Sequence, residues 1–225
     1  MAPGGSAWFC GAVRIPDGLL TRLAVQLGRP HGVAGRAVGR MLNRGNRAVI
    51  TAAVAAATDG AGGGAFADIG FGGGAGLALL LERAGREGRV VGVEIARTML
   101  DAARSRFRAD IAAGRLELHE APMDALPLPD DSLDALISTN TIYFIEDLAP
   151  AFGQLVRVVR PSGRVVLGVG DPVAMAKMPV TRHRFRLRPM AEVIAALDEA
   201  GLSLLEDRRV GNRDAFHLLI CRRRA

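Results

Sequence analysis

The spacing of apolar residues changes along this chain and predicts its elements. Short apolar runs, of the length of buried strands, alternate with segments whose apolar residues recur every three or four positions, as in helices. The predicted strands are 65–69, 89–94, 116–120, 133–138 and 163–169, and the predicted helices are 46–58, 75–86, 97–113 and 148–159. Strands that alternate with helices are typical of parallel βαβ units, so the pattern predicts a doubly wound α/β sheet.

The C-terminal pattern departs from this alternation. A helix is expected at 190–200, and two apolar-rich strands follow it on either side of the turn sequence GNRD at 211–214. Two strands joined by a short Gly/Asn/Asp turn form a hairpin, so we expect the sheet to end with an antiparallel strand. Residues 170–188 show no clear period and predict a long connection, which in compact domains is often functional.

The N-terminal segment has a pattern of its own. Residues 17–44 show two apolar stripes at helical spacing, interrupted by GRPHG at 28–32. We therefore expect residues 1–45 to form an N-terminal helical cap and residues 46–225 to form the main domain.

Composition excludes several classes of protein. With 49% hydrophobic and 23% charged residues the chain is globular. Aromatic residues make up only 4%, which argues against a nucleic-acid platform built on base stacking. The two cysteines form no Cys-x-x-Cys pair, which excludes a zinc ribbon. The N-terminus does not resemble a signal peptide and no apolar stretch reaches about 18 residues, so we expect a cytoplasmic protein without a transmembrane helix.

The net charge of +6 lies in the N-terminal arm. Residues 1–47 hold seven arginines and one acid, and the rest of the chain is balanced. Arg36, Arg40 and Arg44 form a basic helical face, which is interpreted as a lid, as a helix on an anionic surface, or as the solvated face of a packed helix. The basic arm favours an anionic acceptor or anionic lipid as partner. RNA ranks last, because no RNA-binding module is visible.

A glycine-rich loop follows the first predicted strand. Residues 66–76 read FADIGFGGGAG, with Asp68 at the strand end and glycines at every second position after it, namely Gly70, Gly72 and Gly74. Glycines permit positive φ and let a ligand lie against the backbone. The helix that begins near Ala75 points its N-terminus at that ligand.

Two ligand classes compete for this loop. Glu94 closes the second strand, where an acid can accept hydrogen bonds from both ribose hydroxyls. The dinucleotide fingerprint fits Gly70, Gly72 and Ala75, which favours NAD. S-adenosylmethionine (SAM) has no pyrophosphate and carries ammonium and sulfonium centres, so Asp68 favours SAM.

The segment after the third strand adds to the case for SAM. Residues 119–137 read HEAPMDALPLPDDSLDALI, in which the Asp124 carboxylate can accept the adenine amino group. The order and spacing of DIGFGGG, Glu94, PMDALPLPDDSLDAL and RVVRPSGRVVL resemble a class I SAM-dependent methyltransferase over residues 45–221. More narrowly, they resemble the bacterial small-molecule group that includes ubiquinone/menaquinone-biosynthesis enzymes.

This resemblance implies a Rossmann-like seven-stranded sheet and a set of cofactor contacts. In this resemblance Asp68 matches an acid near the methionine end of SAM, and Asn140 matches a position beside the methionine moiety. Glu94 matches the acid that binds the ribose. Ile95 matches an apolar contact to the adenine, and Asp124 matches the acid that binds the adenine. The implied cofactor-binding residues are Asp68, Gly70, Gly72, Gly74, Glu94, Ile95, Met123, Asp124 and Asn140. The loop departs from the family pattern in being richer in glycine at Phe71–Gly73.

The residues that would bind the methyl acceptor are harder to predict from the sequence. Methyl transfer is an in-line displacement, for which an enzyme positions the acceptor and excludes water, and a base is needed only for a protonated nucleophile. The catalytic candidates are Tyr143 and His183, which are also interpreted as a packed aromatic and a solvated loop histidine. Met175 and Met178 either shape an apolar pocket or fill core.

We therefore predict a SAM-dependent methyltransferase, a monomer or homodimer, that acts on an O or N atom of a small-molecule, anionic acceptor. Only Asp171 is well placed as an oxygen ligand, so no metal is expected. The alternatives are an NAD(P)-dependent oxidoreductase that uses the same glycine loop and a catalytically inactive SAM-binding scaffold.

Overall fold

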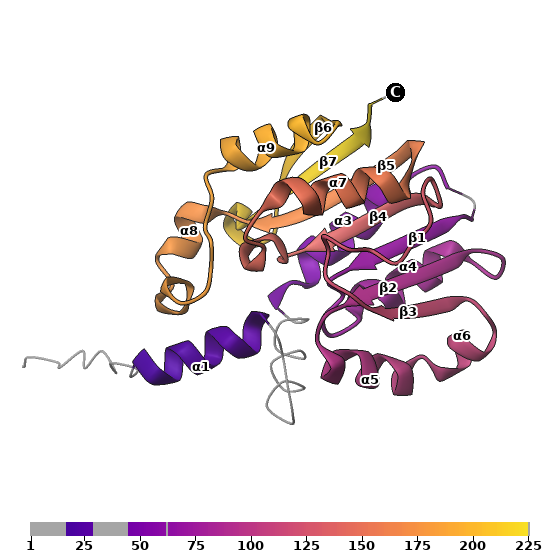
Figure 1. Ribbon diagram of the computed structural model, residues 1–225, viewed down its shortest axis with the longest axis horizontal. Helices are drawn as coiled ribbons and strands as arrows, with labels where there is room; N and C mark the ends of the chain where they lie inside the picture. The colour runs from indigo at the N-terminus through magenta and orange to yellow at the C-terminus, as the bar shows by residue number, and fades with distance from the viewer. Residues whose placement is uncertain (1–16, 29–44, 62, 225) are drawn as a thin grey trace, which may run out of the picture.

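A computed structural model describes residues 17–28, 45–61 and 63–224 (Figure 1). Of the expected N-terminal cap it describes one helix, α1 (Asp17–Gly28). The predicted basic face of Arg36, Arg40 and Arg44 lies outside the described residues.

One seven-stranded sheet organises the described residues, in the order β3-β2-β1-β4-β5-β7-β6. The strands are β1 (Ala65–Ile69), β2 (Arg89–Glu94), β3 (Leu116–Glu120), β4 (Leu133–Thr139), β5 (Val159–Gly170), β6 (Leu202–Val210) and β7 (Phe216–Arg223). Strands β1 to β5 pair in parallel, and β7 is antiparallel to both β5 and β6. The predicted doubly wound sheet with an antiparallel C-terminal hairpin is confirmed.

Helices connect the strands at nearly the expected positions. They are α3 (Arg47–Ala57), α4 (Ala75–Ala84), α5 (Arg97–Arg106), α6 (Arg108–Ala112), α7 (Leu148–Val158), α8 (Pro172–Ala176) and α9 (Met190–Glu199), with 3-10 turns η1 (Ile142–Phe144), η2 (Pro179–Arg182) and η3 (Asn212–Asp214). The single helix expected at 97–113 is two helices, because the chain bends at Phe107 and buries this ring beside Gly74.

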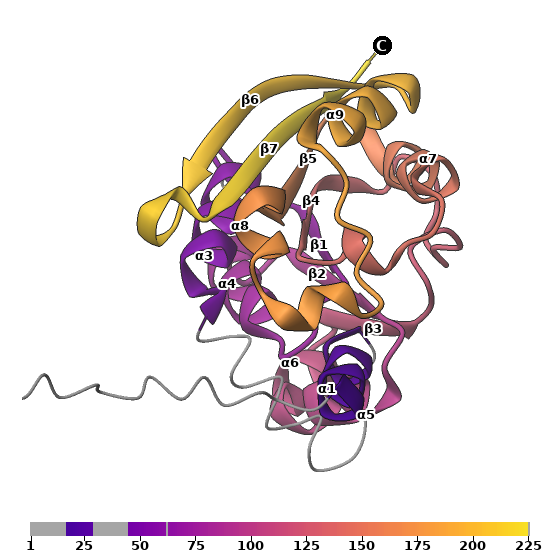
Figure 2. The ribbon, with the colours of Figure 1, turned by 90° about the vertical axis from the view of Figure 1, so that its left-hand side faces the viewer.

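Helical layers cover both faces of the sheet, as a parallel sheet requires. Adjacent residues of β1 point to opposite layers. Phe66 packs in the cluster that contains α3, α4 and α5, and Ala67 packs in the cluster that contains α7 and α9. Figure 2 shows the two layers with the sheet between them. Both clusters are apolar, so the strands read as continuous hydrophobic runs.

The carboxyl ends of the parallel strands meet at one edge of the sheet, beside α8 and α1 (Figure 1). Helix α1 packs against η2 at this edge. Leu20 and Ala24 of α1 are buried with Val180 of η2, and Leu27 and Phe185 pack against them. No helix in the described ranges is both long and apolar enough to span a bilayer.

Candidate functional site

A cavity of about 1380 Å³ lies at the carboxyl ends of the strands. Its wall has two main parts. The sheet-edge group follows β1, β2 and β3 and consists of Gly70–Gly73, Glu94, Ile95, Met99 and Ala121–Asp124. The helical group comes from α1 and from the segments 143–147 and 174–186, and it includes Leu27, Phe144, Met175, Met178, Val180 and Phe185. The ends of β4 and β5 lie at the cavity between these groups.

Gly70, Gly72 and Gly74 of the loop differ in their surroundings. A Cβ on Gly70 would lie 2.7 Å from Cγ2 of Thr141, so a side chain would collide there. Gly72 has φ +51 and no atom within 4 Å of the place of a Cβ, which leaves its backbone open to the cavity. Gly74 has φ +71, precedes the first residue of α4 and is not part of the cavity wall. Positive φ favours glycine at all three positions.

Glu94 ties the glycine loop to the end of β2. Its Oε2 accepts a hydrogen bond from the Gly72 amide at 2.8 Å. Its Oε1 accepts from the amides of Ile95 at 2.8 Å and Ala96 at 2.9 Å. Burial raises the pKa of Glu94, against the lowering effect of these backbone hydrogen bonds. An ionised carboxylate has about four lone-pair sites, so Glu94 can still accept from a ligand in the cavity.

Asp68 is a buried acid beneath the first turn of α4. Its side chain is not part of the cavity wall, and a Cβ on Gly76 would collide with its Oδ2. Within the described ranges no hydrogen bond or ion pair reaches its carboxyl group. Burial, and then the charge of Glu94, raise the pKa of Asp68 to about 8. A cation bound nearby would favour its ionised form.

Ile95, Met123 and Asp124 line one side of the sheet-edge group. Met123 is buried, whereas Ile95 and Asp124 are exposed at the cavity. An apolar surface beside a carboxylate suits a flat heterocycle that carries an amino group.

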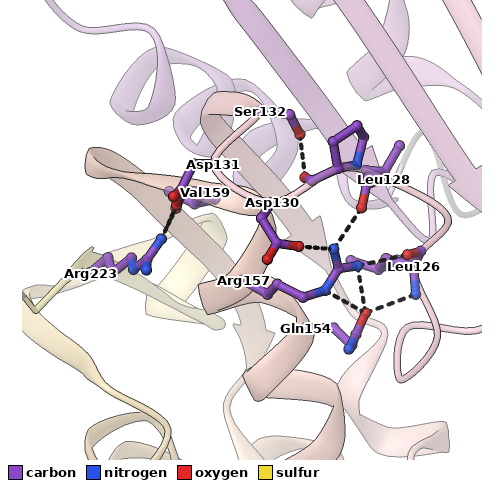
Figure 3. Close-up of polar contacts among 10 residues, drawn as sticks. Leu126, Leu128, Asp130, Asp131, Ser132, Gln154, Arg157, Val159 and Arg223 are labelled. Atoms are coloured by element: carbon purple, nitrogen blue, oxygen red, sulfur yellow. Dashed lines mark hydrogen bonds and ion pairs between the residues drawn. The ribbon is translucent and has the colours of Figure 1, made fainter.

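Helix α7 fixes the segment that follows Asp124. Arg157 donates from Nη2 to the Leu126 carbonyl at 2.8 Å and from Nη1 to the Leu128 carbonyl at 2.7 Å. The Oε1 atom of Gln154 accepts from the Leu126 amide and from Arg157 (Figure 3). Asp130 completes the network with an ion pair to Arg157 at 2.6 Å. The wall around Asp124 is thereby connected to α7, whose buried residues share one apolar cluster with Met123, Leu126 and Leu128.

Asn140 and Tyr143 join the ends of β4 and β5. Asn140 has φ +57, and its amide donates to the Gly168 carbonyl at 2.8 Å. The Tyr143 hydroxyl donates to Oδ1 of Asn140 at 3.1 Å and accepts from the Gly170 amide. Burial raises the pKa of Tyr143 well above its ordinary value. Both residues line the cavity, and the catalytic role of Tyr143 stays a prediction.

His183, the second catalytic candidate, lies away from the cavity wall. Its Nδ1 is 3.2 Å from the Thr21 hydroxyl of α1. The structure therefore does not place His183 and Tyr143 on one wall, and a catalytic role for His183 also stays a prediction.

The chain matches a family model described as a methyltransferase domain over residues 67–167. The GfsG methyltransferase of Streptomyces halstedii is 30% identical over 148 residues, which are 62% of this chain and 52% of that protein. The ubiquinone/menaquinone C-methyltransferase UbiE of Geobacter sulfurreducens is 31% identical over 78 residues, which are 35% of this chain and 30% of that protein. Over residues 67–167 the chain is therefore similar to SAM-dependent methyltransferases.

A solved structure extends this similarity to the fold. A SAM-dependent methyltransferase from Aquifex aeolicus superposes with a TM-score of 0.61 at 20% identity, over 70% of this chain and 81% of that one, which shows a shared fold. The alignments with the curated relatives span 22% to 56% of those proteins' own length.

SAM is the cofactor of the SAM-dependent methyltransferases that the chain resembles, and the described residues fit it. Gly72 leaves an open cradle beside the Glu94 carboxylate. Asp68 is a buried acid without a cationic partner among the described residues. Both features suit a ligand that carries hydroxyls and positive charge. The described ranges contain no cluster of three or more His, Cys, Asp or Glu side chains that could hold a metal ion.

Several residues of the cavity wall could not be predicted from the sequence. Asn46, just before α3, and Ile50 of α3 line the cavity, although their segment shows only an alanine-rich helical pattern. Asn46 precedes α3 without capping it through its side chain, and Ile50 is buried at the wall. Leu27 reaches the cavity only because α1 docks on η2, for which the sequence carries no local signal.

Proposed function

We propose that this chain transfers a methyl group from SAM to an oxygen or nitrogen atom of a small-molecule acceptor by in-line displacement. The proposal rests on one observation. The sheet-edge group combines the glycine loop with Glu94 and Asp124, and its described residues include no arginine, lysine or histidine. A pyrophosphate would meet acids there without a basic partner, whereas a cationic adenosyl ligand would be favoured.

Four residues of the sheet-edge group, and Asp68 beside it, have proposed roles. Glu94 accepts from the ribose hydroxyls, Asp124 from the adenine amino group, and Ile95 and Met123 pack against the adenine. Asp68 balances positive charge at the methionine end. When bound, SAM supplies an activated methyl group on sulfur.

The helical group is proposed to hold the acceptor and to keep water away. Asn140 and Tyr143, whose side chains are hydrogen-bonded to each other, also line the cavity, where they can orient the reacting atom. We further propose that residues 1–45 act as a cap over this part of the cavity. The support is that Ala24, Leu27 and Gly28 of α1 form part of the wall.

Calorimetric titration tests this function. S-adenosylhomocysteine (SAH), SAM and NADH are titrated into the wild type, Glu94→Gln and the control Glu87→Gln, which changes an exposed acid outside the cavity wall. SAH and SAM should bind the wild type and the control alike. Glu94→Gln should weaken binding roughly tenfold or more, because a hydrogen bond to a charged group contributes about 1.5–3 kcal/mol. Binding of NADH alone, or of none of the three ligands, would contradict the proposal.

A further inference from the structure

The helical group of the cavity presents an aromatic and thioether wall. The ring centroids of Phe144 and Phe185 are 4.8 Å apart at 59°, and those of Tyr143 and Phe185 are 5.8 Å apart at 34°. Met175 and Met178 line the cavity with these rings. Aromatic and thioether groups pack favourably against flat rings, so this wall suits an aromatic or conjugated ligand.

Most polar side chains of the helical group already form hydrogen bonds within the protein. The Thr181 hydroxyl donates to the carbonyls of Met175 and Met178, each at 2.8 Å. The Tyr143 hydroxyl is bonded to Asn140 and Gly170.

The charged side chains of the helical group also form an ion pair or a hydrogen bond within the protein, with the exception of Arg184. Glu146 pairs with Arg186 at 2.7 Å. Asp147 accepts from the Ala149 amide at 3.0 Å as the N-cap of α7. Arg184 also lines the cavity, and no ion pair or hydrogen bond holds its guanidinium within the described ranges.

We propose that the acceptor is a flat, largely apolar molecule that carries one carboxylate, with its ring against Phe144 and Phe185 and its carboxylate at Arg184. This inference rests on the proposed function, of which it specifies the acceptor. A guanidinium presents paired donors that match the two oxygens of a carboxylate. A single unpaired cation beside an apolar wall selects for one negative charge on an otherwise apolar ligand.

The charges of the two wall groups also fit this acceptor. The sheet-edge group is acidic and suits a cationic methyl donor, whereas the helical group contains Arg184, a cation without an ion pair within the described ranges. A carboxylate acceptor is therefore repelled from the donor's part of the cavity and attracted to Arg184.

Two matched probes test the inference in protein saturated with SAH, namely 2-naphthoate and its neutral analogue 2-naphthamide. The variants are Arg184→Gln and the control Arg182→Gln, which removes a nearby exposed arginine outside the wall. We expect Arg184→Gln to weaken naphthoate binding about fivefold, as for a partly exposed ion pair, and to leave naphthamide binding unchanged. Arg182→Gln should change neither dissociation constant.

A third variant tests the aromatic wall. Phe185→Leu keeps an apolar side chain but removes the ring, and it should weaken both probes by the same factor. The inference is overturned if neither probe binds, if the two probes bind equally well to the wild type, or if Arg184→Gln behaves like Arg182→Gln. The preceding SAH titration reports separately on the proposed function, so a protein that binds SAH but not naphthoate contradicts only this inference.

Discussion

At the scale of single residues, Asp68 is a buried acid that lowers the stability of the ligand-free protein. Its carboxyl group is buried, close to the charge of Glu94, and without a cationic partner in the part of the chain that the structure describes. Burying an unpaired charge is unfavourable, which is why the pKa of Asp68 rises to about 8. A bound cation would offset this cost, so the acid favours the ligand-bound state over the empty one.

The buried carboxyl group of Asp68 should make the stability of the protein depend on pH. Because the pKa of Asp68 is about 8 in the folded protein against an ordinary 3.8, the folded state binds more protons than the unfolded state between these values. The contribution of Asp68 should therefore lower the free energy of unfolding as pH rises from about 4 to about 8, by at most about 1.4 kcal/mol per pH unit. Denaturant titrations of the ligand-free protein at pH 5 and pH 8 measure the free energy of unfolding at each pH.

The matched variants isolate this contribution. Asp68→Asn should lose less stability between pH 5 and pH 8 than the wild type, and it should bind SAH more weakly. The control Asp101→Asn changes an exposed acid of α5 and should follow the wild type in both measurements. If Asp68→Asn has the same pH dependence as the wild type, Asp68 is not the buried acid described here.

At the scale of elements, α7 supports a cavity wall that it does not itself line. Arg157 and Gln154 bind the backbone at Leu126 and Leu128, a few residues beyond Asp124. Gln154 and Arg157 lie three positions apart and so share one face of the helix. The helix that covers one sheet face thereby fixes the proposed adenine contact at the sheet edge.

Removal of this support should affect ligand affinity as well as folding. Arg157→Met leaves the carbonyls of Leu126 and Leu128 without their partner, which should lower the free energy of unfolding by about 1–3 kcal/mol. We also expect the dissociation constant for SAH to rise roughly tenfold, which equals about 1.4 kcal/mol. The free energy of unfolding and the SAH dissociation constant are both measured at a temperature where all variants are folded in the absence of denaturant.

Two variants check the origin of this effect. Arg157→Lys keeps the charge but not the forked donor geometry, so it should restore SAH affinity only in part. Arg104→Met removes an arginine that pairs with Asp101 on the exposed side of α5, and it should leave SAH affinity unchanged. Unchanged affinity in Arg157→Met would show that α7 does not position the wall.

The bounds of helices and strands could be predicted from the sequence where they depend on neighbouring residues. The first strand at 65–69 is an apolar run between glycines and was predicted with its observed bounds. The start of β5 was not, because Val159 pairs with Leu133 across a β-bulge that no local pattern encodes. The break at Phe107 likewise depends on a contact with the distant Gly74.

At the scale of the whole molecule, the cavity is assembled from segments far apart in the sequence. Gly70, Glu94 and Asp124 were expected at one edge because parallel strands end together, and all three line the cavity. The helical group could be predicted only in part. Met175 and Met178 belong to a connection that was expected to be functional, whereas Leu27 depends on the docking of α1.

The most direct test of the proposed cofactor site is a crystal structure of the protein with SAH. We expect SAH in the cavity, with its ribose on Glu94, its adenine beside Ile95 and Asp124, and its sulfur directed toward the helical group. SAH bound outside the cavity, or with its adenine against Phe144 and Phe185, would overturn the proposed site.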